Sequence, residues 1–270
     1  MTTNLVLRLK AASIVAAFLF TSAFAVSAQQ KYDNTYIEAA TLYQQASGEA
    51  RALEYQTYVL ARMLLDRDLR NRHIRMRRAV IVDLDETVLD NSRYEAELVK
   101  QQQNYPQGWT EWINRAEAAA IPGSVEFLNY AASRGVRVFY VTNRKPIEKE
   151  GTARNLKKLG FPEVSDQTLL VAPESGSSSK EPRRQAISAK YHVVLLMGDD
   201  LNDFAEVFEN SKTVESRIAA TDRNKSQFGT RFVVLPNPMY GSWENSIYEY
   251  NFKLSEADKA ALRRKRLKAY

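Results

Sequence analysis

The sequence predicts an α/β fold built on a mostly parallel β-sheet that is flanked by helices. Five short apolar runs follow one another along the chain, and segments with helical spacing separate several of them. Continuous apolar runs of this kind are typical of strands that are buried on both faces, as in parallel sheets. Polar clusters follow three of the runs directly, where α/β proteins bind their ligands.

The five expected strands cover residues 79–82, 136–141, 169–171, 193–197 and 232–235. Expected helices lie between them, over residues 122–135, about 146–159 and about 182–189. Proline suits the first turn of a helix, as at Pro122, and Gly160 suits a helix end. This alternation of strand and helix predicts a sheet that is covered by helices.

An N-terminal helical segment is expected to precede the sheet. The spacing predicts a helix over residues 35–69, and the stripe expected to face the core consists of Leu42, Ala46, Ala50, Leu53, Leu60 and Leu64. We interpret this segment as structural.

The first 28 residues have the layout of a secretory signal peptide. Arg8 and Lys10 precede an apolar run over residues 11–20, and Val26-Ser27-Ala28 offers small residues at a cleavage site. The run is short for a membrane span, which needs about 20 residues. We therefore expect cleavage after Ala28, followed by one domain over residues 29–270, with N-terminal helices at about 35–70 and a catalytic core at about 77–250. The mature chain is expected to be exported, periplasmic or secreted, without a stable membrane anchor.

Composition excludes several kinds of chemistry. The chain has 270 residues and no cysteine, so it can form neither a disulfide, a thiolate metal site, a cysteine nucleophile nor an N-terminal lipid anchor on cysteine. The formal net charge of +6 is compatible with an anionic substrate. The basic run at residues 263–266 stands at the C-terminus without a binding module, so no nucleic-acid polymer is expected as a partner. A homodimer is left open.

The polar clusters supply carboxylates, a hydroxyl and a cation. Asp83 and Asp85 follow the first strand, Thr142 and Asn143 the second, and Asp199 and Asp203 the fourth, while Lys180 precedes a predicted helix. Close carboxylates repel one another unless a cation lies among them, and an oxygen-only donor set suits Mg²⁺. Thr142 and Lys180 could bind a phosphoryl group, which a carboxylate can attack to give an aspartyl-phosphate.

Four segments of the sequence carry a resemblance to a known family. Residues 81–94, 109–112, 194–204 and 235–244 resemble the signatures of class C bacterial non-specific acid phosphatases, in the haloacid-dehalogenase superfamily. The resemblance runs from about residue 42 to residue 250. It implies a haloacid-dehalogenase-like Rossmannoid fold and a Mg²⁺-dependent phosphomonoesterase acting through an aspartyl-phosphate.

The resemblance also implies roles for the candidate residues. Asp83 would be the nucleophile and a Mg²⁺ ligand, and Asp85 the general acid and base, with its backbone carbonyl on the metal. Asp199 would be a further metal ligand, and Asp203 would orient Lys180 or a metal-bound water.

The remaining implied roles concern the substrate. Thr142, Lys180 and Asn143 would bind the phosphoryl oxygens, and Trp109 and Tyr240 would grip the organic part, often a nucleobase. Nucleoside monophosphates and other small phosphomonoesters are the expected substrates. A sugar-phosphate phosphatase, a phosphotransferase, and a non-catalytic binding or storage protein are the alternatives. The chain departs from relatives that carry a lipid on cysteine, and near Tyr43 and Ser47 it lacks their usual residues.

Overall fold

The computed structural model describes residues 34–270, which belong to one compact unit, Lys31–Tyr270. The predicted signal peptide, residues 1–28, lies outside the described residues. Within residues 34–270, no helix has both the length and the apolar character that crossing a membrane requires.

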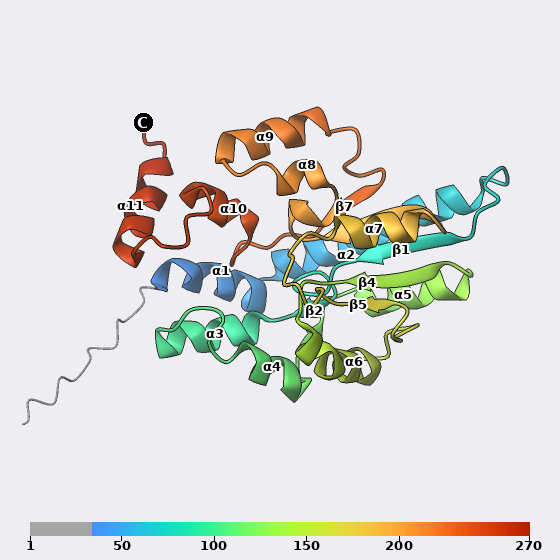
Figure 1. Cartoon of the computed structure of the whole chain (residues 1–270), viewed down its shortest axis with the longest axis horizontal. Helices are drawn as coiled ribbons and strands as arrows, with labels where there is room; N and C mark the ends of the chain where they lie inside the picture. The colour runs from blue at the N-terminus through green and yellow to red at the C-terminus, as the bar shows by residue number, and fades with distance from the viewer. Residues whose placement is uncertain (1–33) are drawn as a thin grey trace, which may run out of the picture. The chain divides into compact units, whose positions relative to one another are not determined.

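A five-stranded sheet forms the centre of this unit (Figure 1). Its strands are β1 (Arg78–Val82), β4 (Arg137–Val141), β5 (Leu169–Leu170), β6 (His192–Gly198) and β7 (Phe232–Val234), in the order β5-β4-β1-β6-β7. All neighbouring strands pair in parallel. The predicted parallel sheet and its five strands are confirmed. A small antiparallel pair, β2 (Leu89–Asp90) and β3 (Ala119–Ala120), was not predicted, because two-residue strands have no sequence signal.

Helices cover both faces of the sheet, as expected for a buried parallel sheet. On one face lie α2 (Gly48–Leu69), α5 (Ser124–Ser133) and α6 (Lys149–Lys158), and on the other α7 (Glu181–Ser188), α8 (Glu206–Glu209) and α9 (Val214–Arg223). Central strand β1 serves both layers, because successive side chains point to opposite faces. Val80 and Val82 join the first hydrophobic cluster, whereas Ala79 and Ile81 join the second.

The remaining helices include several at the carboxyl end of the sheet. Figure 1 shows α1, α3, α10 and α11 on the side toward which β1 points. These remaining helices are α1 (Thr35–Ala46), α3 (Ser92–Gln101), α4 (Trp109–Arg115), α10 (Ser242–Asn245) and α11 (Glu256–Arg266), with short 3₁₀ turns η1 (Pro146–Glu148), η2 (Leu201–Asp203) and η3 (Ser246–Tyr248).

The single helix expected over residues 35–69 is two helices. Ser47 adopts an extended backbone, with φ −93° and ψ 137°, and its side chain accepts a hydrogen bond from the Ala50 N–H at 2.9 Å. Ser47 thus ends α1 and caps α2.

The buried face of this region also differs from the predicted stripe. Leu42 and Leu53 are 54% and 40% exposed, whereas α2 buries Ala50, Glu54, Tyr58, Ala61, Leu64 and Leu65. Hydrogen bonds explain why polar residues take part in the buried face: Gln44 donates to Glu54, and the Tyr58 hydroxyl donates to the Thr87 carbonyl. Because the break at Ser47 restarts the helical phase, one stripe could not describe both helices.

Candidate active site

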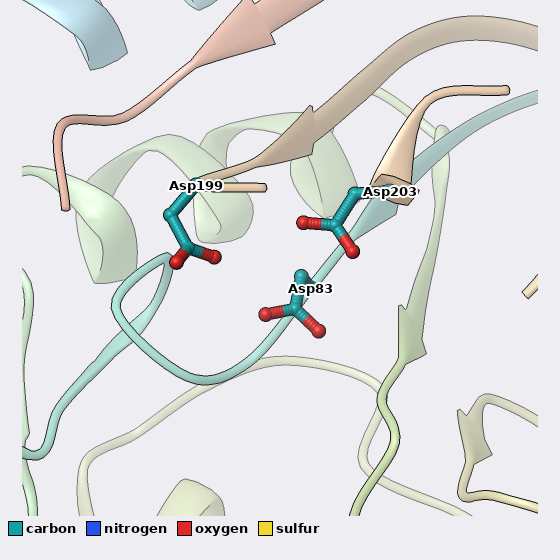
Figure 2. Close-up of side chains that lie close together, drawn as sticks. All are labelled: Asp83, Asp199 and Asp203. Atoms are coloured by element: carbon teal, nitrogen blue, oxygen red, sulfur yellow. The ribbon is translucent and has the colours of Figure 1, made fainter. Parts of the chain in front are cut away.

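Three carboxylates from separate segments meet at the carboxyl edge of the sheet (Figure 2). Asp83 follows β1, Asp199 follows β6, and Asp203 ends η2. One oxygen of each lies within 4.8 Å of one oxygen of the other two. Because β1 and β6 are adjacent parallel strands, the residues that follow them are brought to the same edge.

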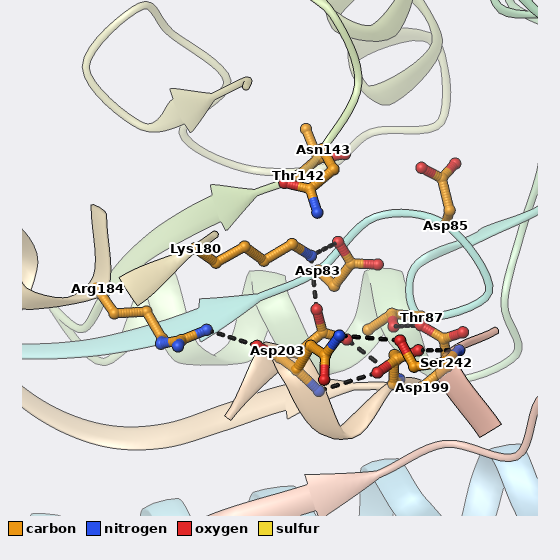
Figure 3. A network of polar contacts seen from close by, with 12 residues as sticks. Asp83, Asp85, Thr87, Thr142, Asn143, Lys180, Arg184, Asp199, Asp203 and Ser242 are labelled. Carbon is orange, nitrogen blue, oxygen red and sulfur yellow. Dashed lines mark hydrogen bonds and ion pairs between the residues drawn. The ribbon is translucent and has the colours of Figure 1, made fainter. Parts of the chain in front are cut away.

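Lys180 joins two of these carboxylates. Its Nζ donates to Asp203 Oδ1 at 2.6 Å and also to Asp83 Oδ1 (Figure 3). The ammonium is buried, and burial alone would lower its pKa, but Asp203 and Asp83 outweigh this effect and raise the pKa of Lys180. Lys180 is therefore held as a cation beside the predicted nucleophile.

The carboxylates remain in electrostatic excess despite Lys180. Burial raises the pKa of Asp83 to about 7, although Lys180 acts to lower it. Burial, and then the charges of Asp203 and Asp83, raise the pKa of Asp199 well above its ordinary value. A divalent cation would relieve this repulsion, and the donors are all oxygens, as hard metal ions prefer. The residues present therefore fit a divalent metal ion.

Two side chains hold Asp199, one at each oxygen of its carboxylate. Thr87 Oγ1 donates to Asp199 Oδ1 at 3.3 Å, and Asn237 Nδ2 donates to Asp199 Oδ2 at 2.8 Å. Asn237 was not singled out from the sequence, although it belongs to the segment 235–244 that carried the resemblance.

The side chain of Asp85 does not join the three-carboxylate cluster. Arg144 Nη2 donates to Asp85 Oδ1 at 2.6 Å, and Asn91 Nδ2 donates to the same oxygen at 2.9 Å. In Figure 3 the Asp85 carboxylate points away from the Asp83–Lys180 ion pair. Of the three residues predicted as metal ligands, Asp83 and Asp199 thus bring their carboxylates together, and Asp85 does not.

Thr142 and Asn143 follow β4, as predicted, and a single arginine ties them to the Lys180 segment. Arg183 Nη1 donates to the Thr142 carbonyl at 2.6 Å, and Nη2 donates to Asn143 Oδ1 at 2.8 Å and to the Ser179 carbonyl at 3.2 Å. Arg183 was missed because Thr142 and Asn143, the candidate residues that it contacts, are 41 and 40 residues away in sequence. Beside Asn143 opens a cavity of ≈ 670 Å³, whose lining includes Lys145, Ser177 and Ser178.

The two predicted substrate-gripping rings have different surroundings. Trp109 is 9% exposed and packs against Tyr94 and Tyr105, with ring centroids 4.9 and 5.8 Å away. Its ring therefore belongs to the core, which corrects the expectation of a free stacking face. Tyr240 is half-buried on the loop that carries Asn237, and Tyr105 is 60% exposed.

The model of one protein family matches most of the chain. Residues 5–243 match the model described as HAD superfamily, subfamily IIIB (Acid phosphatase). The chain belongs to this family of acid phosphatases.

Solved structures agree with the family. The class C acid phosphatase from Bacillus anthracis is 40% identical, with a TM-score of 0.84, over 88% of this chain and 98% of that one. A second crystal structure of the Bacillus anthracis enzyme, with tungstate bound, matches equally well. The predicted family and the haloacid-dehalogenase-like fold are confirmed, and both comparisons indicate a phosphomonoesterase.

More distant relatives are two soybean proteins. The Stem 31 kDa glycoprotein of Glycine max is 26% identical over 59% of this chain, which spans 58% of that relative. The Stem 28 kDa glycoprotein of the same plant is 23% identical over 76% of this acid phosphatase chain and 74% of its own length.

Proposed function

We propose that this acid phosphatase hydrolyses small phosphomonoesters through an aspartyl-phosphate formed on Asp83. The observation that carries the proposal is the ion pair of Asp83 with Lys180, next to Asp199 and Asp203. A carboxylate at this position can attack phosphorus while the Lys180 ammonium binds a phosphoryl oxygen.

The proposed first step forms one bond and breaks one. A carboxylate oxygen of Asp83 bonds to phosphorus, the bond from phosphorus to the ester oxygen breaks, and Asp85 gives that oxygen its proton. Thr142, Asn143 and Lys180 hold the other phosphoryl oxygens. In the second step Asp85 takes a proton from water and the water oxygen bonds to phosphorus. The bond from phosphorus to the Asp83 oxygen breaks, which releases phosphate and restores the Asp83 carboxylate.

We further propose Mg²⁺ as the metal, bound by Asp83, Asp199 and the backbone carbonyl of Asp85. When bound, Mg²⁺ would supply positive charge for the carboxylates and the phosphoryl oxygens. Asp203 hydrogen-bonds Lys180 and thereby orients the ammonium. The tungstate in the 40% identical Bacillus anthracis enzyme supports a phosphoryl site, because tungstate is a tetrahedral oxyanion like phosphate.

We expect Asp83→Asn to abolish hydrolysis of p-nitrophenyl phosphate, because an amide cannot form the acyl phosphate. Asp222→Asn, an equally small change at an exposed residue of α9, is the control and should keep full activity. Circular dichroism would verify the fold of both variants. Turnover by Asp83→Asn near the rate of the unchanged protein would contradict the mechanism, and no turnover by the unchanged protein with Mg²⁺ would favour a binding or storage role.

For the substrate we propose nucleoside monophosphates, with Tyr240 and Tyr105 offering ring faces to the base. Tyr105 replaces Trp109 in this proposal because it is the exposed ring of the Trp109 cluster. Burial, and then the charges of Glu148 and Asp85, raise the pKa of Tyr105. The second candidate is a sugar phosphate, whose hydroxyls could bond to the polar residues Lys145, Ser177 and Ser178 in the lining of the cavity beside Asn143.

Tyr240→Ala should raise KM for a nucleoside monophosphate and leave kcat nearly unchanged. Stacking is worth about 1–3 kcal/mol per base and acts equally in the ground and transition states, so it affects binding only. Glycerol phosphate has no ring, and its KM should not change. An equal loss of kcat/KM on both substrates would contradict the stacking proposal and favour a structural role for Tyr240.

We also propose that residues 1–28 are a signal peptide and that the mature enzyme is exported. N-terminal sequencing of the exported protein should begin at Gln29. An intact N-terminus on the exported protein would contradict cleavage at this site.

A further inference from the structure

Arg144 is a buried arginine whose guanidinium is bonded at all three nitrogens. Nε and Nη2 donate to Asp85, Nη1 donates to Thr152 Oγ1 at 3.0 Å, and the guanidinium carbon lies 5.6 Å from the centre of the Trp109 ring. Only 3% of Arg144 is exposed. Thr152 itself is fully buried and donates to the Glu148 carbonyl, so the support of the guanidinium is also fixed.

The two oxygens of Asp85 have unequal surroundings. Oδ1 accepts from Arg144 Nη2 at 2.6 Å, from Asn91 Nδ2 at 2.9 Å and from Arg144 Nε at 3.0 Å. Oδ2 has one longer contact, with Arg144 Nε at 3.3 Å. Asn91 is held in turn, because its Oδ1 accepts from Trp112 Nε1 at 2.9 Å.

This asymmetry determines where a proton can reside on Asp85. A guanidinium has five donors and no acceptor, and it does not deprotonate in proteins. A proton on Oδ1 would therefore face other donors and find no acceptor among them. Oδ2 is the oxygen that can carry the proton without displacing these hydrogen bonds.

We propose that Arg144 is a positioning residue, which anchors Oδ1 of Asp85 and so makes Oδ2 the atom that exchanges the proton with the leaving group. The inference rests on the proposed role of Asp85 as general acid and base. Arg144 belongs to the same three-residue segment as Thr142 and Asn143, and its N–H donates to Thr142 Oγ1 at 3.1 Å. The end of β4 thus sets both the phosphoryl contacts and the orientation of the acid. Trp109, packed on Arg144, acts on the site through this arginine.

The test compares kcat/KM for two substrates that differ in their need for an acid. The p-nitrophenolate ion leaves readily without a proton, whereas the alkoxide of glycerol 2-phosphate does not. For each substrate, kcat/KM reports the steps up to departure of the leaving group. The later hydrolysis of the aspartyl-phosphate therefore does not mask a loss of acid catalysis. The variants are Asp85→Asn, Arg144→Met and Arg144→Lys. Arg78→Met removes another arginine–aspartate pair, Arg78–Asp68, at the amino end of β1, and serves as the matched control.

General acid catalysis contributes about 10²–10⁴-fold, so Asp85→Asn should lose about this factor on glycerol 2-phosphate and far less on p-nitrophenyl phosphate. Arg144→Met should show the same selectivity, with at least about a tenfold greater loss on glycerol 2-phosphate. Arg78→Met should lower the melting temperature without any selectivity. In the Asp85→Asn background, Arg144→Met should add no further selective loss.

The outcomes separate the inference from the proposed function. An equal loss on both substrates in Asp85→Asn would overturn the role of Asp85 itself. A selective loss in Asp85→Asn together with an equal loss in Arg144→Met would overturn the role of Arg144 alone. If Arg144→Met does not fold, Arg144→Lys is the variant that tests the inference. Lysine keeps the positive charge but cannot donate two parallel hydrogen bonds to the Asp85 carboxylate. A selective loss in that variant supports the inference, and no selectivity overturns it.

Discussion

Asp203 reaches its place beside Lys180 because residue 198 has no side chain. A Cβ at Gly198 would lie 2.3 Å from Asp203 Oδ2 and 2.5 Å from its Cβ. These distances are far below any real contact, so a side chain there would have to displace Asp203. The glycine at the end of β6 therefore permits the close approach that builds the Asp203–Lys180–Asp83 contact.

We expect Gly198→Ala to lower kcat sharply, because the displaced Asp203 can no longer orient Lys180. Gly48→Ala is the matched control, since a Cβ at Gly48 has no neighbour within 4 Å. Steady-state kinetics on p-nitrophenyl phosphate, together with thermal melting, would measure both effects. Unchanged kcat in a folded Gly198→Ala protein would show that the position of Asp203 does not matter for turnover.

Which site residues could be predicted depends on where their partners lie. Asp83, Thr142 and Asp199 each follow an apolar strand, and strand ends converge in a parallel sheet. Arg144 stands in the same polar segment as Thr142, but its pairing with Asp85, 59 residues away in sequence, becomes visible only in the fold. Arg183 likewise bonds Thr142 across 41 residues. A buried arginine resembles any surface arginine until the fold is known.

At the scale of elements, the strands could be predicted from the sequence, but the buried faces of the two N-terminal helices could not. Each strand of the main sheet is a short apolar run, and burial on both faces requires that composition. Helix α2 instead buries Glu54, whose hydrogen bond from Gln44 forms only because the chain turns at Ser47. A hydrophobic stripe cannot reveal a buried polar residue whose partner depends on tertiary packing.

Helix α3 carries a buried acid that links stability to pH. Burial, and then the charge of Glu244, raise the pKa of Glu95 to about 7. The folded state therefore binds a proton that the unfolded chain has lost between the unfolded pKa of about 4.3 and about 7. The contribution of Glu95 to the free energy of unfolding is fully present below about pH 4.3 and is lost as the pH rises from about 4.3 to about 7.

Glu95→Gln should remove this dependence. The variant should match the unchanged protein near pH 4 and be more stable near pH 8, by on the order of 3 kcal/mol, because each tenfold difference in proton affinity between the folded and unfolded states corresponds to about 1.4 kcal/mol. Urea unfolding at several pH values would measure the difference. A constant difference between the two proteins from pH 4 to pH 8 would contradict the assignment to Glu95.

At the scale of the whole molecule, the net charge of the chain and the charge of the acidic site have opposite signs. The formal net charge is +6, yet the active site gathers three carboxylates, of which Asp83 and Asp203 are buried and share the buried Lys180. Near the C-terminus, Arg266 pairs with Glu215, and the guanidinium carbon of Arg263 lies 3.6 Å from the centre of the Tyr36 ring. Part of the basic run at residues 263–266 thus holds α11 against the rest of the chain.

Metal binding should change both activity and stability of the whole molecule. We expect chelation to abolish turnover and added Mg²⁺ to restore it. A ligand at 100 times its Kd adds about 2.7 kcal/mol of stability, so Mg²⁺ should raise the melting temperature. Asp199→Asn should lose this increase, because it removes one carboxylate of the cluster. An equal increase in both proteins would place the metal elsewhere, and full activity after chelation would contradict metal dependence.

The position of β1 has a consequence for how the protein becomes active. This strand comes first in the sheet by sequence but lies at its centre, between β4 and β6. Asp83, at its end, meets Lys180 only across 97 residues of chain. Such long-range contacts form slowly, because loop closure precedes the gain from pairing. The enzyme therefore becomes active only once the central strands of the sheet have paired. During synthesis or refolding, the enzyme should show no phosphatase activity until its last central strand, β6, has paired with β1, however much helix has already formed.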